Sequence, residues 1–168
     1  TNVMRVGGKL PGFLTFVLDF GKGGLSVLLA KTFIPLMVID IETQKIYLSL
    51  AGVIVVCGHV FSVFLRFKGG KGISTLFGVL AVLHINIGIC AAIVWLVMFF
   101  WKHISSLSGI TMLTALPWLF LLIPWVKNES PVWPVFFLFL LLSFLLVYKH
   151  FENIKRLLKG HEGQLSTS

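Results

Sequence analysis

The stretch VWPVFFLFLLLSFLLVY, residues 132–148, contains no charged residue and consists almost entirely of aliphatic and aromatic side chains. A helix of this composition is apolar on every face, and about 20 such residues cross the ~30 Å hydrocarbon core of a bilayer. The whole chain shares this character, since 57% of its 168 residues are hydrophobic and 12% are charged. Soluble domains carry about 25% charged residues. We therefore predict an integral membrane protein.

The sequence contains six apolar runs, of which residues 132–148 are the last. Backbone groups without a hydrogen-bond partner cost several kcal/mol in hydrocarbon, so the runs are expected to form helices. We predict an all-α, polytopic transmembrane helix bundle that forms a single integral membrane domain over residues 1–168, with 161–168 as a mobile tail. The six runs are Pro11–Pro35, Ile46–Leu65, Ile73–His84, Ile85–Trp101, Leu107–Val126 and Val132–Tyr148.

Basic residues are distributed unevenly between the connections. If all six runs cross the membrane, Arg5 lies on the same side as Lys102 and as the basic residues within 66–71 and 149–159. The opposite side receives only two lysines, which lie beside acidic residues. Because cytoplasmic loops are enriched in lysine and arginine, we predict that the basic side and the C-terminus face the cytoplasm. Ile73–His84 is short enough to be re-entrant, but only a crossing keeps all the basic clusters together.

Charge and composition also exclude several classes of function. The net charge of +8 suits nucleic acid, anionic lipid or anionic substrates, but no polar DNA-reading domain remains outside the apolar runs. Cys57 and Cys90 lie inside apolar runs and show neither metal-ligand nor disulfide spacing. The histidines at 59, 84 and 103 are scattered, and no carboxylate or cysteine completes a metal-ligand set with them. We predict no nucleic-acid partner, no metal site and no cofactor.

The most informative polar stretch is KGGKG, residues 68–72, between two apolar runs. Three glycines allow successive N–H groups to turn toward one point, and the helix expected from Ile73 would offer its positive dipole end to the same anion. Two lysines add charge. The spacing differs from that of a nucleotide-binding P-loop, because glycine follows the second lysine. The pattern favours a phosphate site, while the alternative is a flexible basic loop that only sets topology.

A second polar stretch, HFENIKRLLKGHE, covers residues 150–162. At ~100° per residue, His150, Asn153 and Arg156 lie on one arc of a helix beside an apolar stripe. Such a helix could rest on the bundle and direct a proton acceptor, an amide and a phosphate-binding guanidinium toward the membrane surface. The alternative is an interfacial amphipathic tail with snorkelling bases.

Asp19 and Lys22 place two charges inside the first apolar run, where charges are usually paired or functional. Their spacing of three predicts an ion pair along a helix. The glycines that follow Lys22 could kink this helix or allow close packing. A role near the substrate is the alternative to a structural pair.

Together these stretches resemble the three motifs of the PlsY family of bacterial glycerol-3-phosphate acyltransferases. The resemblance extends from Thr1 to Glu162. The first motif ends in Thr-Asn-x-x-Arg, matched by Thr1, Asn2 and Arg5. The second, Gly-His-x-x-Pro-x-Phe-x-x-Phe-Lys-Gly-Gly-Lys-Gly, is matched at Gly58, His59, Phe64, Phe67, Lys68, Gly69, Gly70, Lys71 and Gly72. The third, His-x-x-Asn-x-x-Arg-x-x-x-Gly-x-Glu, is matched at His150, Asn153, Arg156, Gly160 and Glu162. Asp19, Lys22 and Gly23 match the family's Asp-x-x-Lys-Gly.

The resemblance implies an enzyme of the bacterial cytoplasmic membrane that moves an acyl group from acyl phosphate to the sn-1 hydroxyl of glycerol 3-phosphate. The products are lysophosphatidate and phosphate, and the implied partners are the two substrates and membrane lipid. It implies that His150 and Asn153 position the attacking hydroxyl. Phosphate binding is expected at Thr1, Asn2, Arg5, Lys68, Gly69, Gly70, Lys71, Gly72 and Arg156. Structural support is expected from Asp19, Lys22, His59, Gly160 and Glu162.

Two departures from the family pattern stand out. Ser62 occupies the position where the family usually has proline. The family's first motif begins with Ser-Gly-Asn-Pro-Gly, after a further span, and both would lie upstream of Thr1. We therefore expect a longer parent protein with seven spans, and the activity of the chain as it stands is left open.

Two other functions compete with acyl transfer. A small anion or organophosphate transporter would also place bases at a membrane mouth, but would carry polar residues at mid-membrane depth in several spans. A structural subunit with a lipid-binding basic face would need neither the three glycines nor the arc that contains Asn153.

Overall fold

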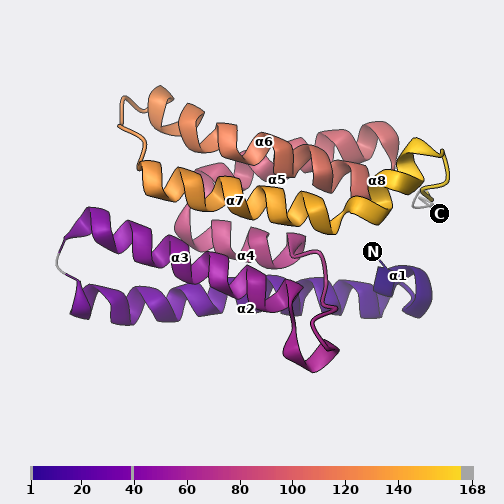
Figure 1. Ribbon diagram of the computed structural model, residues 1–168, viewed down its shortest axis with the longest axis horizontal. Coiled ribbons are helices and arrows are strands. Elements are labelled where there is room, and N and C mark those ends of the chain that lie inside the picture. The colour runs from indigo at the N-terminus through magenta and orange to yellow at the C-terminus, as the bar shows by residue number, and fades with distance from the viewer. Residues whose placement is uncertain (1, 39, 164–168) are drawn as a thin grey trace. The chain divides into compact units, whose positions relative to one another are not determined.

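The computed structural model describes residues 2–38 and 40–163, without the side chains of Asn2 and Arg5. Regular structure in the described residues is entirely helical (Figure 1), which confirms the predicted fold class. The helices group into two compact units, Thr1–Ile85 and Asn86–Ser168.

Each of the six predicted apolar runs lies in a helix, although Ile46–Leu65 ends in a separate 3₁₀ turn. The first unit contains α1 (Asn2–Gly7), α2 (Lys9–Met37), α3 (Ile41–Val60), η1 (Val63–Leu65) and α4 (Ile73–Leu83). From the unit boundary onward follow α5 (Ile85–Lys102), α6 (Ser105–Val126), α7 (Trp133–Lys149) and α8 (Phe151–Leu158).

Four apolar stretches of the described residues are long enough to cross a membrane by themselves. They are α2, the stretch Ile41–Leu65, α5 and α6, and the bent pair of α7 and α8 makes a fifth candidate. Helix α4 has 11 residues, which gives a length of about 16 Å, roughly half of the hydrocarbon core. The crossing predicted for Ile73–His84 therefore stays a prediction.

Glycines bring α2 and α4 into backbone contact. A Cβ atom at Gly23 would overlap the carbonyl oxygen of Thr75, and one at Gly78 would overlap that of Phe20. A Cβ atom at Gly24 would lie 3.4 Å from the Gly78 carbonyl oxygen. Small residues permit this approach in membrane helices, where dispersion contacts replace the hydrophobic effect. The α2 glycines thus serve close packing, and α2 continues through them as a helix.

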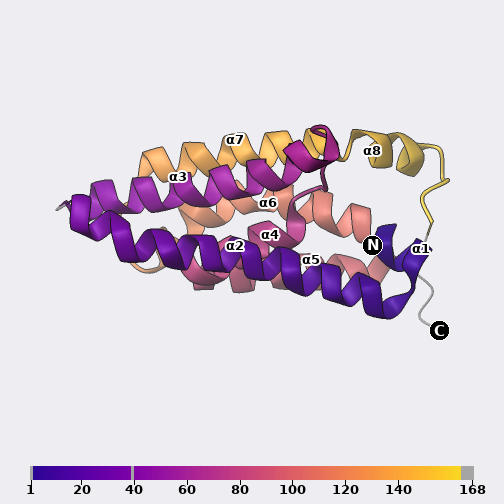
Figure 2. The same cartoon turned by 90° about the horizontal axis from the view of Figure 1, so that it is seen from below.

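The C-terminal end of α4 is also held by α2. Lys31 donates from Nζ to the carbonyl oxygen of Val82 at 2.7 Å, one of the carbonyls that the end of a helix leaves without an intrahelical donor. Lys31 lies within the apolar span of α2, so this bond gives its ammonium a partner. Helix α3 lies beside α2 (Figure 2) and begins at Asp40, whose carboxylate accepts from the Thr43 N–H at 2.7 Å.

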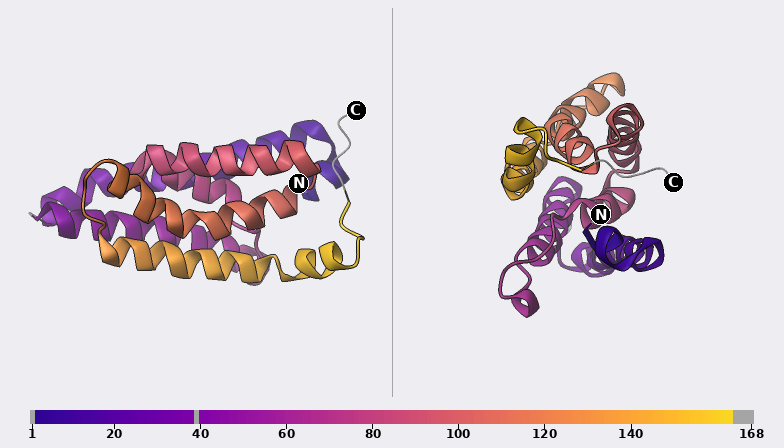
Figure 3. Two further views of the ribbon diagram at one scale, coloured as in Figure 1. Left: turned by 90° about the horizontal axis from the view of Figure 1, so that it is seen from above. Right: turned by 90° about the vertical axis from the view of Figure 1, so that its right-hand side faces the viewer.

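In the second unit, α6 and α7 pack side by side, as the left view of Figure 3 shows. The rings of Phe120 and Phe139 stack between them with their centroids 4.4 Å apart. At His150 the chain bends by 56° into α8. This bend directs the C-terminal polar stretch away from the axis of α7.

Candidate functional site

The residues after α3 form a loop that closes on itself before α4 begins (Figure 1). The Gly69 N–H donates to the carbonyl oxygen of Val60 at 3.2 Å, which returns the chain to the end of α3. Gly72 then adopts a φ of 80° and caps α4, a left-handed conformation that glycine adopts with little strain. The glycines therefore place Lys68 and Lys71 immediately before the positive end of the α4 dipole.

Gly69 and Gly70 have a packing role that the sequence analysis did not predict. A Cβ atom at Gly69 would overlap the His59 carbonyl oxygen, and one at Gly70 would overlap Nε2 of the His59 ring. Among the three loop glycines, only Gly72 has a positive φ. Two of the three therefore permit contact with the end of α3, in addition to exposing backbone N–H groups.

His59 connects this loop to the charged pair of α2. Lys22 and Asp19 form the predicted ion pair, and Lys22 Nζ lies 2.6 Å from His59 Nδ1. The Asp19 carboxylate lies 3.4 Å from the same nitrogen. An ammonium group can only donate, so Nδ1 accepts, and the neutral ring carries its proton on Nε2, the atom that faces Gly70. Asp19 and Lys22 thus fix the His59 ring, against which the glycine loop packs.

The lysines of the glycine loop differ in exposure, since Lys68 is exposed and Lys71 is half-buried. The first motif is described less fully. Thr1 lies outside the described residues, and Asn2 and Arg5 belong to α1 without a description of their side chains.

A second polar cluster lies in the other unit and centres on Glu162. Its Oε1 accepts from Asn153 Nδ2 and from Ser106 Oγ, both at 2.7 Å, and its Oε2 accepts from Arg156 Nε at 2.7 Å. The Glu162 side chain is 3% exposed. Glu162 thus lies in a buried, hydrogen-bonded position at the start of the expected mobile tail, of which residues 164–168 lie outside the description.

Gly160 explains how Glu162 reaches these partners. It adopts a φ of 68° directly after α8. The Gly160 N–H donates to Leu157 O and the His161 N–H donates to Arg156 O, the pattern of a Schellman turn. The turn reverses the chain, so that the residue two positions after Gly160 lies over the polar face of α8.

The Glu162 carboxylate is ionised at neutral pH. Burial raises the pKa of its carboxyl group, but the hydrogen bonds from Ser106, Arg156 and Asn153, together with the Arg156 charge, lower it to about 2. The bond to Arg156 uses Nε, so the end of the guanidinium formed by its two terminal nitrogens is directed away from this bond, while one N–H of the nearer nitrogen lies parallel to the Nε–H. A guanidinium held in this way is pre-organised to bind a phosphate with its outer edge.

His150 is buried at the junction of α7 and α8. Its Nδ1 lies 2.7 Å from the carbonyl oxygen of Leu146. A carbonyl can only accept, so Nδ1 carries the proton and the lone pair of the neutral ring lies on Nε2. The predicted arc of His150, Asn153 and Arg156 stays a prediction, and in the structure Asn153 and Arg156 both bind the Glu162 carboxylate.

Ser106 is the residue of this cluster that the sequence analysis missed. It lies in the first turn of α6 and is 8% exposed. A serine pair, Ser105 and Ser106, opens an apolar helix shortly after the basic residue Lys102. That position on the predicted basic side was the available signal, but its contact with Glu162 spans 56 residues of sequence.

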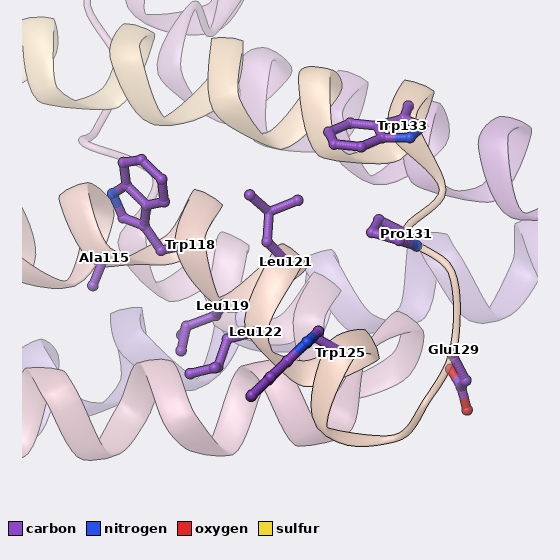
Figure 4. A pocket seen from close by; sticks show the side chains of 9 residues that line it. All are labelled: Ala115, Trp118, Leu119, Leu121, Leu122, Trp125, Glu129, Pro131 and Trp133. Carbon is purple, nitrogen blue, oxygen red and sulfur yellow. The ribbon is translucent and has the colours of Figure 1, made fainter.

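An apolar pocket occupies the opposite end of α6. Its volume is about 660 Å³, and Trp118, Trp125 and Trp133 contribute rings to its wall (Figure 4). Ser106 and Trp125 lie at opposite ends of α6, which has 22 residues and is about 33 Å long, so the pocket is remote from the Glu162 cluster. Within residues 2–38 and 40–163, no three histidine, cysteine or acidic side chains gather as a metal site would require.

The sequence profile described as "Glycerol-3-phosphate acyltransferase" matches residues 1–160. A protein of that name from Prochlorococcus marinus subsp. pastoris is 36% identical over 96% of this chain and 76% of its own length. Another from Legionella pneumophila is 34% identical over 98% of this chain but 54% of its own length. The chain thus spans between half and three quarters of these relatives.

Two solved structures share the fold. The crystal structure of PlsY, an integral membrane glycerol 3-phosphate acyltransferase, in its glycerol 3-phosphate form, gives a TM-score of 0.80 at 34% identity. This match covers 99% of this chain and 76% of the chain in the crystal structure. The lysophosphatidic acid form gives 0.79 at 35% identity and covers 99% and 78%. The match of sequence and fold over nearly the whole chain shows that this integral membrane protein belongs to the glycerol-3-phosphate acyltransferase family.

Proposed function

We propose that this chain carries the acyl-transfer site of its parent enzyme, which acylates the sn-1 hydroxyl of glycerol 3-phosphate with acyl phosphate as donor. The supporting observation is the pair of related structures, one a glycerol 3-phosphate form and the other a lysophosphatidic acid form. Those two ligands differ by one acyl group on a hydroxyl. They are therefore the acceptor and the product of a single acyl transfer.

The reaction needs two kinds of group from the protein. The hydroxyl oxygen of glycerol 3-phosphate attacks the carbonyl carbon of the acyl phosphate, an ester C–O bond forms, and the bond from that carbon to the phosphate oxygen breaks. The hydroxyl proton ends on the released phosphate. Both substrates carry phosphate, so cations must hold anions while an acceptor orients the hydroxyl.

The described residues offer groups for both tasks. Lys68 and Lys71 bracket a glycine pair before the N-terminus of α4, where a phosphate would be stabilised. Arg156 has its Nε bound to Glu162 and its outer edge available for a second phosphate. We assign to His150 Nε2 and the side-chain oxygen of Asn153 the role of orienting the hydroxyl. If His150 also carries the hydroxyl proton, a variant without the His150 ring should lose more activity than if the phosphate takes the proton directly.

We further propose that the basic clusters face the cytoplasm of a bacterial cell, as the distribution of lysine and arginine indicates. The transporter alternative has no observation in its favour once the family is shown.

The test is transfer of the acyl group from palmitoyl phosphate to radiolabelled glycerol 3-phosphate. It should be measured on the chain alone and on the chain extended by the upstream span and Ser-Gly-Asn-Pro-Gly motif of a relative. Labelled lysophosphatidate from the extended protein, lost in the Lys71→Ala and His150→Ala variants, would support the proposal. A folded, extended protein that gives no product with acyl phosphate or acyl-coenzyme A would contradict it.

A further inference from the structure

The loop of residues 61–68, between α3 and the glycines, displays large apolar side chains to the exterior. Phe64 is 98% exposed, and Val63, Leu65 and Phe67 are each more than half exposed. A patch of this kind at the end of a span is costly in water. We therefore expect this apolar patch to contact an apolar environment outside the described helices.

Part of the backbone of this loop is hydrogen-bonded within the chain. The N–H groups of residues 65–69 all donate to carbonyl oxygens of residues 60–65, at distances between 2.8 and 3.2 Å. Arg66 and Phe67 adopt φ values of 50° and 63° to close it, a conformation that non-glycine residues rarely adopt. Internal satisfaction of backbone donors is what a segment requires in lipid, whereas a loop in water can use solvent instead.

The charges of the loop indicate which part of a bilayer suits it. Arg66 alternates with the exposed apolar residues, and Lys68 follows them. No acidic residue occurs between Glu42 and Glu129. Long basic side chains extend their charged ends toward phosphate headgroups while their stems stay in apolar surroundings. The apolar stretch that begins with α3 also continues through η1 to Leu65.

From these observations we propose that the loop of residues 61–68 inserts into the headgroup boundary of an anionic phospholipid leaflet, with Phe64 among the upper acyl chains and Arg66 on the lipid phosphates. The loop would then be a lipid-binding surface in its own right, independent of the acyl-transfer proposal. It would also hold the following glycine loop at the depth of the headgroups.

The test measures the depth of a spin label in the full chain. Phe64→Cys, in a background of Cys57→Ala and Cys90→Ala, is labelled with a nitroxide in phosphatidylcholine vesicles with or without phosphatidylglycerol. Glu42→Cys, at the polar start of α3, is the matched control. We expect the label at 64 to collide severalfold more often with oxygen, which concentrates in lipid, than with a water-soluble nickel complex, and the control to show the reverse.

Two other results would overturn the proposal. A label at 64 that prefers the nickel complex places the loop in water. A label that meets neither reagent means that protein covers the loop, either another part of this chain or a second copy. Val63→Cys repeats the measurement if the first variant does not fold. Phosphatidylglycerol should increase the depth of the nitroxide at position 64 in the bilayer. Arg66→Gln should abolish this increase, and Arg66→Lys should keep it. An unchanged increase in Arg66→Gln would exclude the contact of Arg66 with the headgroups.

Discussion

The two polar clusters of this protein hold their cations by different means. In the first unit, Lys68 and Lys71 are placed by shape, because Gly69 and Gly70 fit against the end of α3 where no Cβ atom fits. In the second, Arg156 is placed by charge, because the Glu162 carboxylate binds its Nε. The comparison shows that a cation can be held in place either by close packing of the backbone or by an internal anion. The two clusters should therefore fail under different perturbations.

The largest effect is expected from Gly69→Ala. The added methyl group would meet the backbone carbonyl of His59, which no side-chain rotation can move away, so overpacking should cost about 3 kcal/mol and misplace the lysines. We expect loss of nearly all acyl transfer and a lower thermal midpoint in detergent. Gly58→Ala is the control, since a Cβ atom there meets nothing within 4 Å. Equal behaviour of the two variants would refute placement by shape.

Glu162→Gln should be the next most severe change. The variant keeps the shape of the side chain but loses its charge, and hydrogen bonds to charged groups contribute about 1.5–3 kcal/mol. Because Arg156 would lose its ionic partner, we expect a rise of at least about tenfold in KM for glycerol 3-phosphate. Glu152→Gln, at an exposed pair with Lys155, should change little. A KM in Glu162→Gln equal to that of the wild type would show that Arg156 does not depend on the carboxylate.

Low pH should weaken the cluster around Glu162, because that cluster depends on an ionised carboxylate. The pKa of Glu162 is lowered from its ordinary value of 4.5 to about 2, so its stabilising contribution is complete above pH 4.5 and is lost as the pH falls toward 2. The difference in thermal midpoint between the wild type and Glu162→Gln should therefore be largest at neutral pH and should shrink through this window. A difference that stays constant down to pH 3 would contradict this account.

Ser106→Ala should have the smallest effect of the four. It removes one of three hydrogen bonds to Glu162, which should cost about 1 kcal/mol and raise KM about fivefold with little change in kcat. Ser106→Thr keeps the hydroxyl and should restore the KM. If both variants lower kcat and leave KM unchanged, Ser106 does not act through Arg156.

The sequence predicted those features that depend on local pattern. Runs of apolar residues indicated the helices, and a spacing of three predicted the pair of Asp19 and Lys22. The long-range contacts that complete each polar cluster could not be predicted from local sequence pattern. His59 contacts Lys22 across 37 residues of sequence and Ser106 contacts Glu162 across 56. No local sequence pattern identifies a partner so distant. The glycines were identified, but their packing role depends on where α3 ends.

The bond from Lys31 to the end of α4 also affects the glycine loop at the other end of that helix. A helix carries about half a positive charge at its N-terminus and half a negative charge at its C-terminus. In a helix only about 16 Å long, packed against α2 and α3, the distant negative end would weaken the field felt by an anion at Gly72. The Lys31 ammonium at Val82 neutralises that end. Helix α4 consequently acts toward a phosphate less as a dipole than as an isolated positive charge, supplied by the backbone alone.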